Sequence, residues 1–84
     1  MNELDIRRTI KEAVANVCNI ALEDIGDAAS FKEELGLDSL ALLELSIDIE
    51  VRFALDVPEE GLVQLHTVQD AVELVQQSLL AKQT

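Results

Sequence analysis

The segment from Leu40 to Phe53 is the most apolar stretch of the chain, and it decides what the chain can fold into. From Leu45 onward hydrophobic and polar residues alternate, which taken alone is the pattern of a β-strand. The preceding residues 40–45 favour a helix and do not alternate. A strand would also need a partner, and no other segment of the sequence offers one. We therefore predict a helix from Ser39 to about Ala54.

At about 100° per residue, this predicted helix carries two apolar stripes on roughly opposite sides. The first stripe is Leu42, Leu45, Ile49 and Phe53, and the second is Leu40, Leu43, Ile47 and Val51. Glu44 and Asp48 flank the second stripe on one edge, and Glu50 flanks it on the other. Because full burial is hard to arrange in so small a domain, we interpret the second stripe as a partner-binding surface. The alternative is a helix clamped between two others.

Three further helices are predicted around this one. Residues 2–18 form an amphipathic helix that Asn2 can cap, and its apolar stripe is Ile6, Ile10, Ala13, Val14 and Val17. Pro58 fits the first position of a short third helix. Thr67 caps a fourth helix, whose apolar stripe is Val68, Ala71, Val72, Val75 and Leu79. The fold class is therefore all-α, a four-helix bundle in a single domain of residues 1–84 with a core of about residues 3–80.

The connection between the first two predicted helices is long, and we expect it to be structured by its own packing. Its apolar anchors are Ile20, Leu22, Ile25, Phe31 and Leu35. Residues 30–33 have the S-x-x-E form of a capping box, which predicts one short helical turn.

Charge narrows the partners that the chain can have. Among 84 residues there are 17 acids and 6 bases, giving a net charge of −11. So acidic a chain repels nucleic acid phosphate and is attracted to basic patches on partner proteins. The residues after Met1 do not form a signal sequence, and no apolar run is long enough to span a bilayer. We expect a cytoplasmic monomer without membrane insertion.

Catalytic and metal-binding patterns are missing from the sequence. Cys18 is the only cysteine and His66 the only histidine, so neither a disulfide nor a thiolate metal site can be built. There is no G-x-S-x-G motif, no cysteine–histidine pair and no phosphate-binding glycine loop. We predict no catalytic residues, no metal site and no autonomous enzyme activity.

Ser39 remains as the candidate for chemistry. Either Asp38 or Ser39 could serve simply as the N-cap of the helix that follows. The position also suits an attached phosphate, because a helix N-terminus offers free N–H groups and a positive dipole end. Gly36 allows the preceding loop to turn sharply and leave the serine exposed.

The residues 35–40, Leu-Gly-Leu-Asp-Ser-Leu, resemble the attachment motif of acyl carrier proteins and the related peptidyl carrier domains. The likeness continues without a gap from the first predicted helix to Val75, and it includes Ser30-Phe31, Glu44-Leu45, Phe53, Val57-Pro58 and Thr67-Val68-Gln69. The resemblance implies a four-helix carrier with a long structured loop after the first helix and a short third helix.

The resemblance also implies a function. A phosphopantetheinyl transferase would move 4'-phosphopantetheine from coenzyme A to Ser39, and the thiol of this arm would carry acyl groups as thioesters. Partner enzymes, meaning acyl-transfer and synthase enzymes with basic docking patches, would belong to fatty acid or polyketide biosynthesis. The alternative function is an unmodified acidic helical adaptor that only binds a basic partner protein.

Family members dock through their second helix, and several positions match. These are Asp38, Leu40, Glu44, Ile47 and Glu50, to which the stripe analysis adds Leu43 and Asp48. Ala41, Val51 and Arg52 depart from the family, because fatty-acid carriers commonly have acids at these positions. Residues 38–44 resemble stand-alone polyketide carriers and residues 67–69 resemble fatty-acid carriers, so both pathways stay open.

Overall fold

The computed structural model describes residues 2–56 and 65–82. Within these residues the chain forms the α-helices α1 (Glu3–Cys18), α2 (Ser39–Phe53) and α4 (Val68–Lys82), together with the short 3-10 helix η1 (Leu22–Asp24). The described part contains no β-strand, only one isolated bridge, so the all-α fold class is confirmed. The short helix predicted to begin at Pro58 lies outside the described residues.

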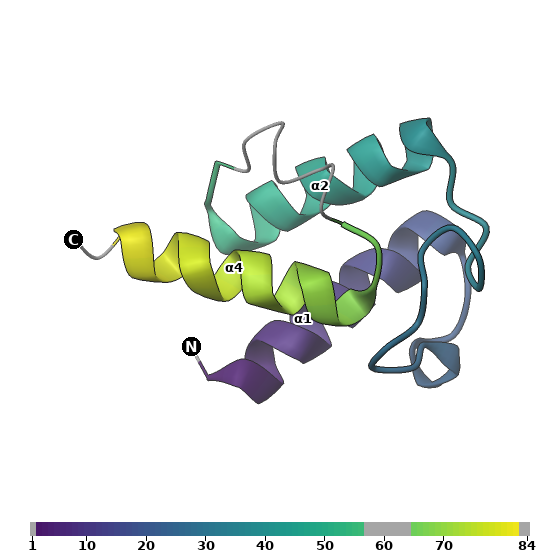
Figure 1. The fold of residues 1–84 in the computed structure, drawn as a ribbon, viewed down its shortest axis with the longest axis horizontal. Coiled ribbons are helices and arrows are strands. Elements are labelled where there is room, and N and C mark those ends of the chain that lie inside the picture. The colour runs from purple at the N-terminus through teal and green to yellow at the C-terminus, as the bar shows by residue number, and fades with distance from the viewer. Residues whose placement is uncertain (1, 57–64, 83–84) are drawn as a thin grey trace.

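Helix α1 packs against both α2 and α4. The start of α1 and the end of α4 lie at one end of the molecule, and the connection formed by residues 19–38 lies at the other (Figure 1). One hydrophobic core joins the three helices, and every fully buried side chain in it is aliphatic except Phe31. The core residues of α2 are the whole first stripe predicted from the sequence: Leu42, Leu45, Ile49 and Phe53.

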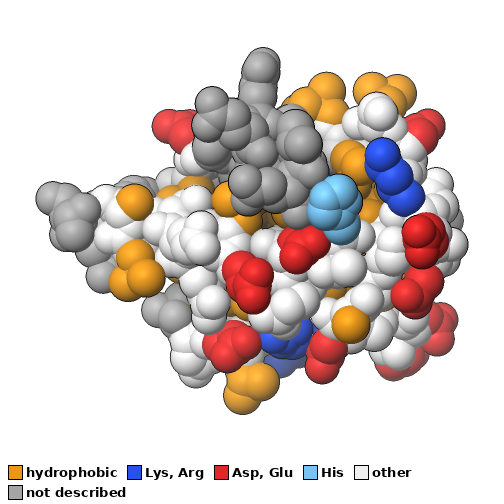
Figure 2. Space-filling view, in the orientation of Figure 1, with side chains coloured by type: hydrophobic (Ala, Val, Ile, Leu, Met, Phe, Trp, Pro, Cys, Tyr) orange, Lys and Arg blue, Asp and Glu red, His pale blue; other side chains and the backbone are white. Residues whose placement is uncertain are grey.

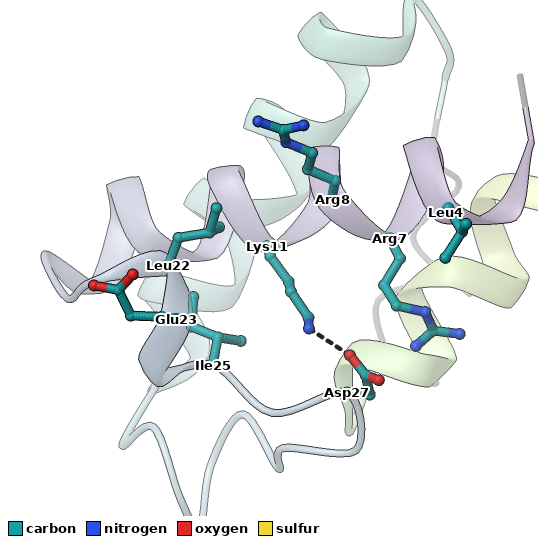
Figure 3. Close-up of a pocket in the computed structure, with 8 residues that line it drawn as sticks. All are labelled: Leu4, Arg7, Arg8, Lys11, Leu22, Glu23, Ile25 and Asp27. Atoms are coloured by element: carbon teal, nitrogen blue, oxygen red, sulfur yellow. Dashed lines mark hydrogen bonds and ion pairs between the residues drawn. The ribbon is translucent and has the colours of Figure 1, made fainter.

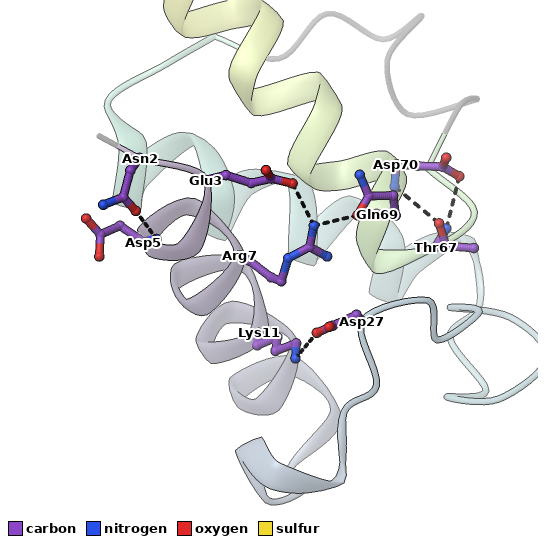
Figure 4. A network of polar contacts seen from close by, with 9 residues as sticks. All are labelled: Asn2, Glu3, Asp5, Arg7, Lys11, Asp27, Thr67, Gln69 and Asp70. Carbon is purple, nitrogen blue, oxygen red and sulfur yellow. Dashed lines mark hydrogen bonds and ion pairs between the residues drawn. The ribbon is translucent and has the colours of Figure 1, made fainter.

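Local caps fix where the helices begin. The Asn2 side chain accepts a hydrogen bond from the Asp5 N–H at 2.9 Å, which starts α1 as predicted. At α4 the Thr67 hydroxyl accepts from the Asp70 N–H at 3.2 Å, and the Asp70 carboxylate accepts from the Thr67 N–H at 3.1 Å. This reciprocal pair is a capping box (Figure 4). Both predicted caps are confirmed.

Side-chain contacts also connect elements that are distant in sequence. The guanidinium of Arg7 donates to Glu3 at 2.9 Å within α1 and to the amide oxygen of Gln69 in α4 at 2.6 Å. The ammonium of Lys11 pairs with Asp27 of the long connection (Figure 4). Helix α1 is therefore held to α4 and to the loop by polar contacts as well as by the core.

The long connection is structured, but not by all of its predicted anchors. Ile25 and Phe31 are buried, Leu35 is half-buried, and Ile20 and Leu22 are exposed. The Phe31 N–H donates to the His66 carbonyl at 2.8 Å and the Val68 N–H donates to the Ala29 carbonyl at 3.1 Å, which ties the loop to the start of α4. The expectation that Ile20 and Leu22 are buried anchors was wrong, and backbone bonds contribute to fixing the connection alongside the buried side chains.

The predicted capping box in this connection is only partly formed. The Ser30 hydroxyl accepts from the Glu33 N–H at 3.3 Å, as the motif requires, but Glu34 and not Glu33 approaches the Ser30 N–H, at 3.4 Å. Residues 31–34 form a hydrogen-bonded turn that does not continue as a helix. The buried side chain of Phe31 and the hydrogen bond from its N–H to the His66 carbonyl hold this turn in place.

Candidate functional site

Asp38 begins α2 and leaves Ser39 exposed. The Asp38 carboxylate accepts a hydrogen bond from the Ala41 N–H at 2.8 Å, so Asp38 is the N-cap. Ser39 is then the first residue of α2, and its side chain makes no hydrogen bond to another described residue. Of the two capping residues that the sequence allowed, the structure uses Asp38. The Ser39 hydroxyl therefore makes no stabilising hydrogen bond in the described part of the fold.

Leu37 anchors the residues immediately before Ser39. Leu37 is buried, and its N–H donates to the Phe31 carbonyl at 2.8 Å. Gly36 has a φ of +67°, in the left-handed region that favours glycine. The chain thus turns at Gly36, inserts Leu37 into the core and emerges at the exposed Ser39.

The second stripe of α2 is exposed along its whole length. The exposed fractions are 65% for Leu40, 44% for Leu43, 51% for Ile47 and 74% for Val51. In the described part of the chain, neither α1 nor α4 covers this side of the helix, which is opposite the buried stripe. Figure 2 shows hydrophobic side chains protruding at the edge of the molecule where α2 begins. An aliphatic strip therefore extends along the helix from the residue next to Ser39.

The acids beside this strip differ in their surroundings. Glu44 is exposed, and no described residue forms an ion pair with it. Asp48 is half-buried and accepts hydrogen bonds from the Arg52 Nε at 2.9 Å and from the Asn16 Nδ2 at 3.4 Å. Glu50 is half-buried on the other edge. Asp38, Leu40, Leu43, Glu44 and Ile47 are all exposed, between the N-cap and the middle of α2.

Arg52 is a residue of this surface that sequence reasoning noted only as a departure. Besides Asp48, it approaches Glu12 of α1, with 3.7 Å between the Nη1 and Oε2 atoms. The i,i+4 spacing of Asp48 and Arg52 is a signal that could have predicted the first pair. The pairing with Glu12 depends on how α1 and α2 pack, which the sequence pattern does not contain.

The remaining reactive side chains do not assemble a second centre near Ser39. The backbone of His66 is fixed by bonds to Phe31 and Asp70, and no described contact links His66 to Ser39. Burial raises the pKa of the Cys18 thiol, which keeps it protonated at neutral pH. Among residues 2–56 and 65–82, no group of three His, Cys, Asp or Glu side chains could hold a metal ion.

A hollow of about 540 Å³ lies on the other side of α1, away from α2 (Figure 3). Its lining residues are Leu4, Arg7, Arg8, Lys11, Leu22, Glu23, Ile25 and Asp27. The hydrogen bond and the charge of Lys11 hold the pKa of Asp27 below its ordinary value. The Lys11–Asp27 pair connects α1 to the loop across this hollow. Because Arg7 is also paired, with Glu3, the hollow offers little free positive charge to a ligand.

Comparison with known proteins gives consistent results. A family model described as "Phosphopantetheine attachment site" matches residues 8–75. An acyl carrier protein of Thermosynechococcus vestitus is 33% identical over 81 residues, which cover 96% of this chain and 100% of that protein. The match to the family model includes Ser39 and the whole of α2.

Two solved structures resemble the fold. One is the apo doublet acyl carrier protein from prodigiosin biosynthesis, with a TM-score of 0.76, 20% identity and coverage of 87% of this chain and 35% of that chain. The other is the acyl carrier protein of Enterococcus faecalis, with a TM-score of 0.74, 20% identity and coverage of 93% of this chain and 99% of that chain. At this identity both likenesses concern the fold alone. Among the described residues, no helix is both long and apolar enough to cross a membrane.

Proposed function

This chain belongs to the acyl carrier protein family, whose cofactor is phosphopantetheine, and we propose that Ser39 is the residue to which the phosphopantetheine arm is attached. The observation that carries this proposal is that Asp38, and not Ser39, caps α2. Asp38 caps the helix, so the exposed hydroxyl of Ser39 is available for a covalent bond. The serine lies in the matched family region, in the Asp-Ser-Leu motif.

The start of α2 suits the product of this modification. In the transfer, the Ser39 oxygen would bond to the phosphorus that bears the pantetheine group of coenzyme A. The pyrophosphate bond of coenzyme A would break, the nucleotide part would leave, and the hydroxyl proton would be released. The resulting phosphodiester would lie at a helix N-terminus, where the helix dipole favours an anion. A phosphopantetheinyl transferase would catalyse this step, since the Asp38 carboxylate next to Ser39 is already engaged as the N-cap of α2.

The attached arm would supply a thiol, and acyl groups would be carried on it as thioesters. The only thiol of the chain itself, Cys18, is half-buried with a raised pKa and is a poor competitor for acylation. The exposed strip and the acids at the start of α2 would then dock enzymes with basic patches, of fatty acid or polyketide biosynthesis. Apolar area supplies affinity in such a surface, and the acids supply orientation and faster association.

Intact mass measurement tests the attachment. The purified chain is incubated with a phosphopantetheinyl transferase and coenzyme A, and we expect one phosphopantetheinyl group on the wild type and none on Ser39→Ala. Ser78→Ala, which changes a half-buried serine of α4, is the control and should be modified like the wild type. An unmodified wild type, or a modified Ser39→Ala protein, would contradict the proposal.

Cellular assays of Ser39→Ala and Ile47→Asp separate the carrier from the unmodified adaptor. If the chain were only an adaptor, Ser39→Ala would keep its cellular activity while Ile47→Asp, which places a charge in the exposed strip, would lose it. For the carrier we expect both variants to be inactive, and far-UV circular dichroism should show that both retain their helices.

A further inference from the structure

One edge of α2 presents three charged residues at intervals of one helical turn. Glu44, Asp48 and Arg52 are spaced by four residues, so they lie in one row beside the exposed aliphatic strip. From the start of the helix the row reads negative, negative, positive. The charge that this edge presents to a partner protein depends on whether Asp48 is paired with Arg52.

Asp48 pairs with Arg52, and its carboxylate is largely occupied within the chain. Its Oδ1 atom accepts from the Arg52 Nε at 2.9 Å, and its Oδ2 atom accepts from the Asn16 Nδ2 at 3.4 Å, so both oxygens are engaged. The Asp48 side chain is only 19% exposed. An acid at position i with a base at i+4 is also the favourable orientation of such a pair on a helix.

Arg52 also connects the Asp48–Arg52 pair to charged residues of α1. The Glu12 carboxylate lies 3.7 Å from the Arg52 guanidinium. It also lies 3.5 Å from the guanidinium of Arg8, four residues earlier in α1. Arg8, Glu12, Asp48 and Arg52 therefore form a cluster of two bases and two acids with no net charge. In a chain with a net charge of −11, this edge of α2 therefore carries no net charge near the end of the helix, while the acid Glu50 lies on the other edge.

The start of α2 is different. Glu44 is exposed without an ion-pair partner in the described part of the chain, and the exposed Asp38 lies at the N-cap. Glu44 and Arg52 are eight residues apart, about 12 Å along the helix axis. Because this exceeds the Debye length of about 10 Å in 0.1 M salt, a partner can distinguish the two ends.

We propose that Arg52 is a specificity-determining residue of the docking surface: by neutralising Asp48 it confines the attraction for basic partners along this edge of α2 to the start of the helix, beside Ser39. This inference rests on the proposed carrier function. The surface fits a partner whose basic patch is compact and lies close to the opening that receives Ser39, with an apolar recess for Leu43 and Ile47. A partner whose basic patch extends along all of α2 would place a cation against Arg52 and be disfavoured.

An NMR titration with a basic probe tests this proposal. The unmodified, ¹⁵N-labelled chain is titrated with an octalysine peptide in about 0.1 M salt, where charges a Debye length apart act separately. In the wild type we expect amide shifts to be larger in residues 38–47 than in residues 48–53. In Arg52→Gln the shifts of residues 48–53 should rise to the level of residues 38–47, because Asp48 becomes available to the peptide.

Two controls isolate the charge at this position. Arg52→Lys keeps the positive charge and should give the wild-type pattern. Lys32→Gln removes the same charge from the exposed surface of the long connection, outside this cluster, and it should also give the wild-type pattern. A uniform wild-type pattern, an unchanged pattern in Arg52→Gln, or an equal change in either control would overturn the proposal.

The double variant Asp48→Asn/Arg52→Gln keeps the test decisive if Arg52→Gln is poorly folded. It retains the net charge of the wild type, and its shifts in residues 48–53 should stay low. High shifts there would contradict a role for Asp48. Because the titration uses the unmodified chain, its outcome is independent of the mass measurement, which alone decides whether Ser39 is modified.

Discussion

Asp38 serves two purposes that a pair of substitutions can separate. Its carboxylate caps α2 through the Ala41 N–H, and its charge lies beside Ser39. Asp38→Ala should lower the free energy of unfolding by about 1 kcal/mol, the usual cost of losing an N-cap. Asp38→Asn keeps a capping oxygen and should stay close to wild-type stability in urea unfolding.

Modification rates complete this comparison. If the charge of Asp38 assists the transferase, Asp38→Asn should slow the modification of Ser39 although its stability is normal. Equal rates for Asp38→Asn and the wild type would show that Asp38 acts only as a cap.

The Lys11–Asp27 pair predicts a pH-dependent contribution to stability. The hydrogen bond and charge of Lys11 lower the folded-state pKa of Asp27, so the pair stabilises the fold at and above the ordinary pKa of an aspartate, about 4. The contribution is lost as the pH falls through the lowered pKa of the folded state. Lys11→Met should therefore melt below the wild type at pH 7, and the two melting temperatures should converge in acid.

Lys11→Arg provides the control, because it keeps a positive charge opposite Asp27. A difference between Lys11→Met and the wild type that persisted unchanged at the lowest pH at which both are folded would mean that Lys11 stabilises by packing and not through Asp27.

Within α2, two isoleucines on opposite sides of one helix allow a matched test of its two faces. Ile49 is 1% exposed and Ile47 is 51% exposed. Ile49→Ala should cost about 2–5 kcal/mol, the usual range for removing a core isoleucine side chain. Ile47→Ala should change the free energy of unfolding by less than about 0.5 kcal/mol, as an exposed substitution does.

The opposite order is expected for docking. Ile47→Ala should raise the KM of the transferase for the chain, because it removes apolar contact area from the proposed surface. A loss of stability for Ile47→Ala as large as that for Ile49→Ala would mean that the strip is part of the core.

The secondary-structure elements differ in how far local sequence pattern alone predicted them. Helix α2 alternates like a strand from Leu45 to Phe53, yet its four buried apolar residues lie on one side only at the helical period, which favours the helix. The caps at Asn2 and Thr67 use neighbours within three residues, so the sequence predicted them. The turn at Ser30 was only partly predictable, because the buried Phe31 side chain and the hydrogen bond from the Phe31 N–H to the His66 carbonyl set its geometry.

At the scale of the whole molecule, the net charge of −11 predicts a response to salt. Raising the salt concentration from 0.01 to 0.15 M shortens the Debye length from about 30 to about 8 Å and screens the self-repulsion of the folded state. The melting temperature should rise over this range, while association with a basic partner should weaken.

Sodium and potassium chloride should act alike if screening is the cause. A melting temperature that fell with added salt would show that ion pairs such as Lys11–Asp27 outweigh self-repulsion among the acids.

The sequence by itself determined the helices α1, α2 and α4, the buried stripe of α2 and the motif around Ser39, because helical periodicity and capping depend on residues only a few positions apart. Only the tertiary structure decided that Asp38 and not Ser39 caps α2, and that the second stripe stays uncovered by α1 and α4. It alone placed Glu12 of α1 beside Arg52, because that contact joins residues 40 positions apart through the packing of two helices. The packing thereby divides the charges along one edge of α2 into a negative start and a neutral end, which the sequence alone can only count.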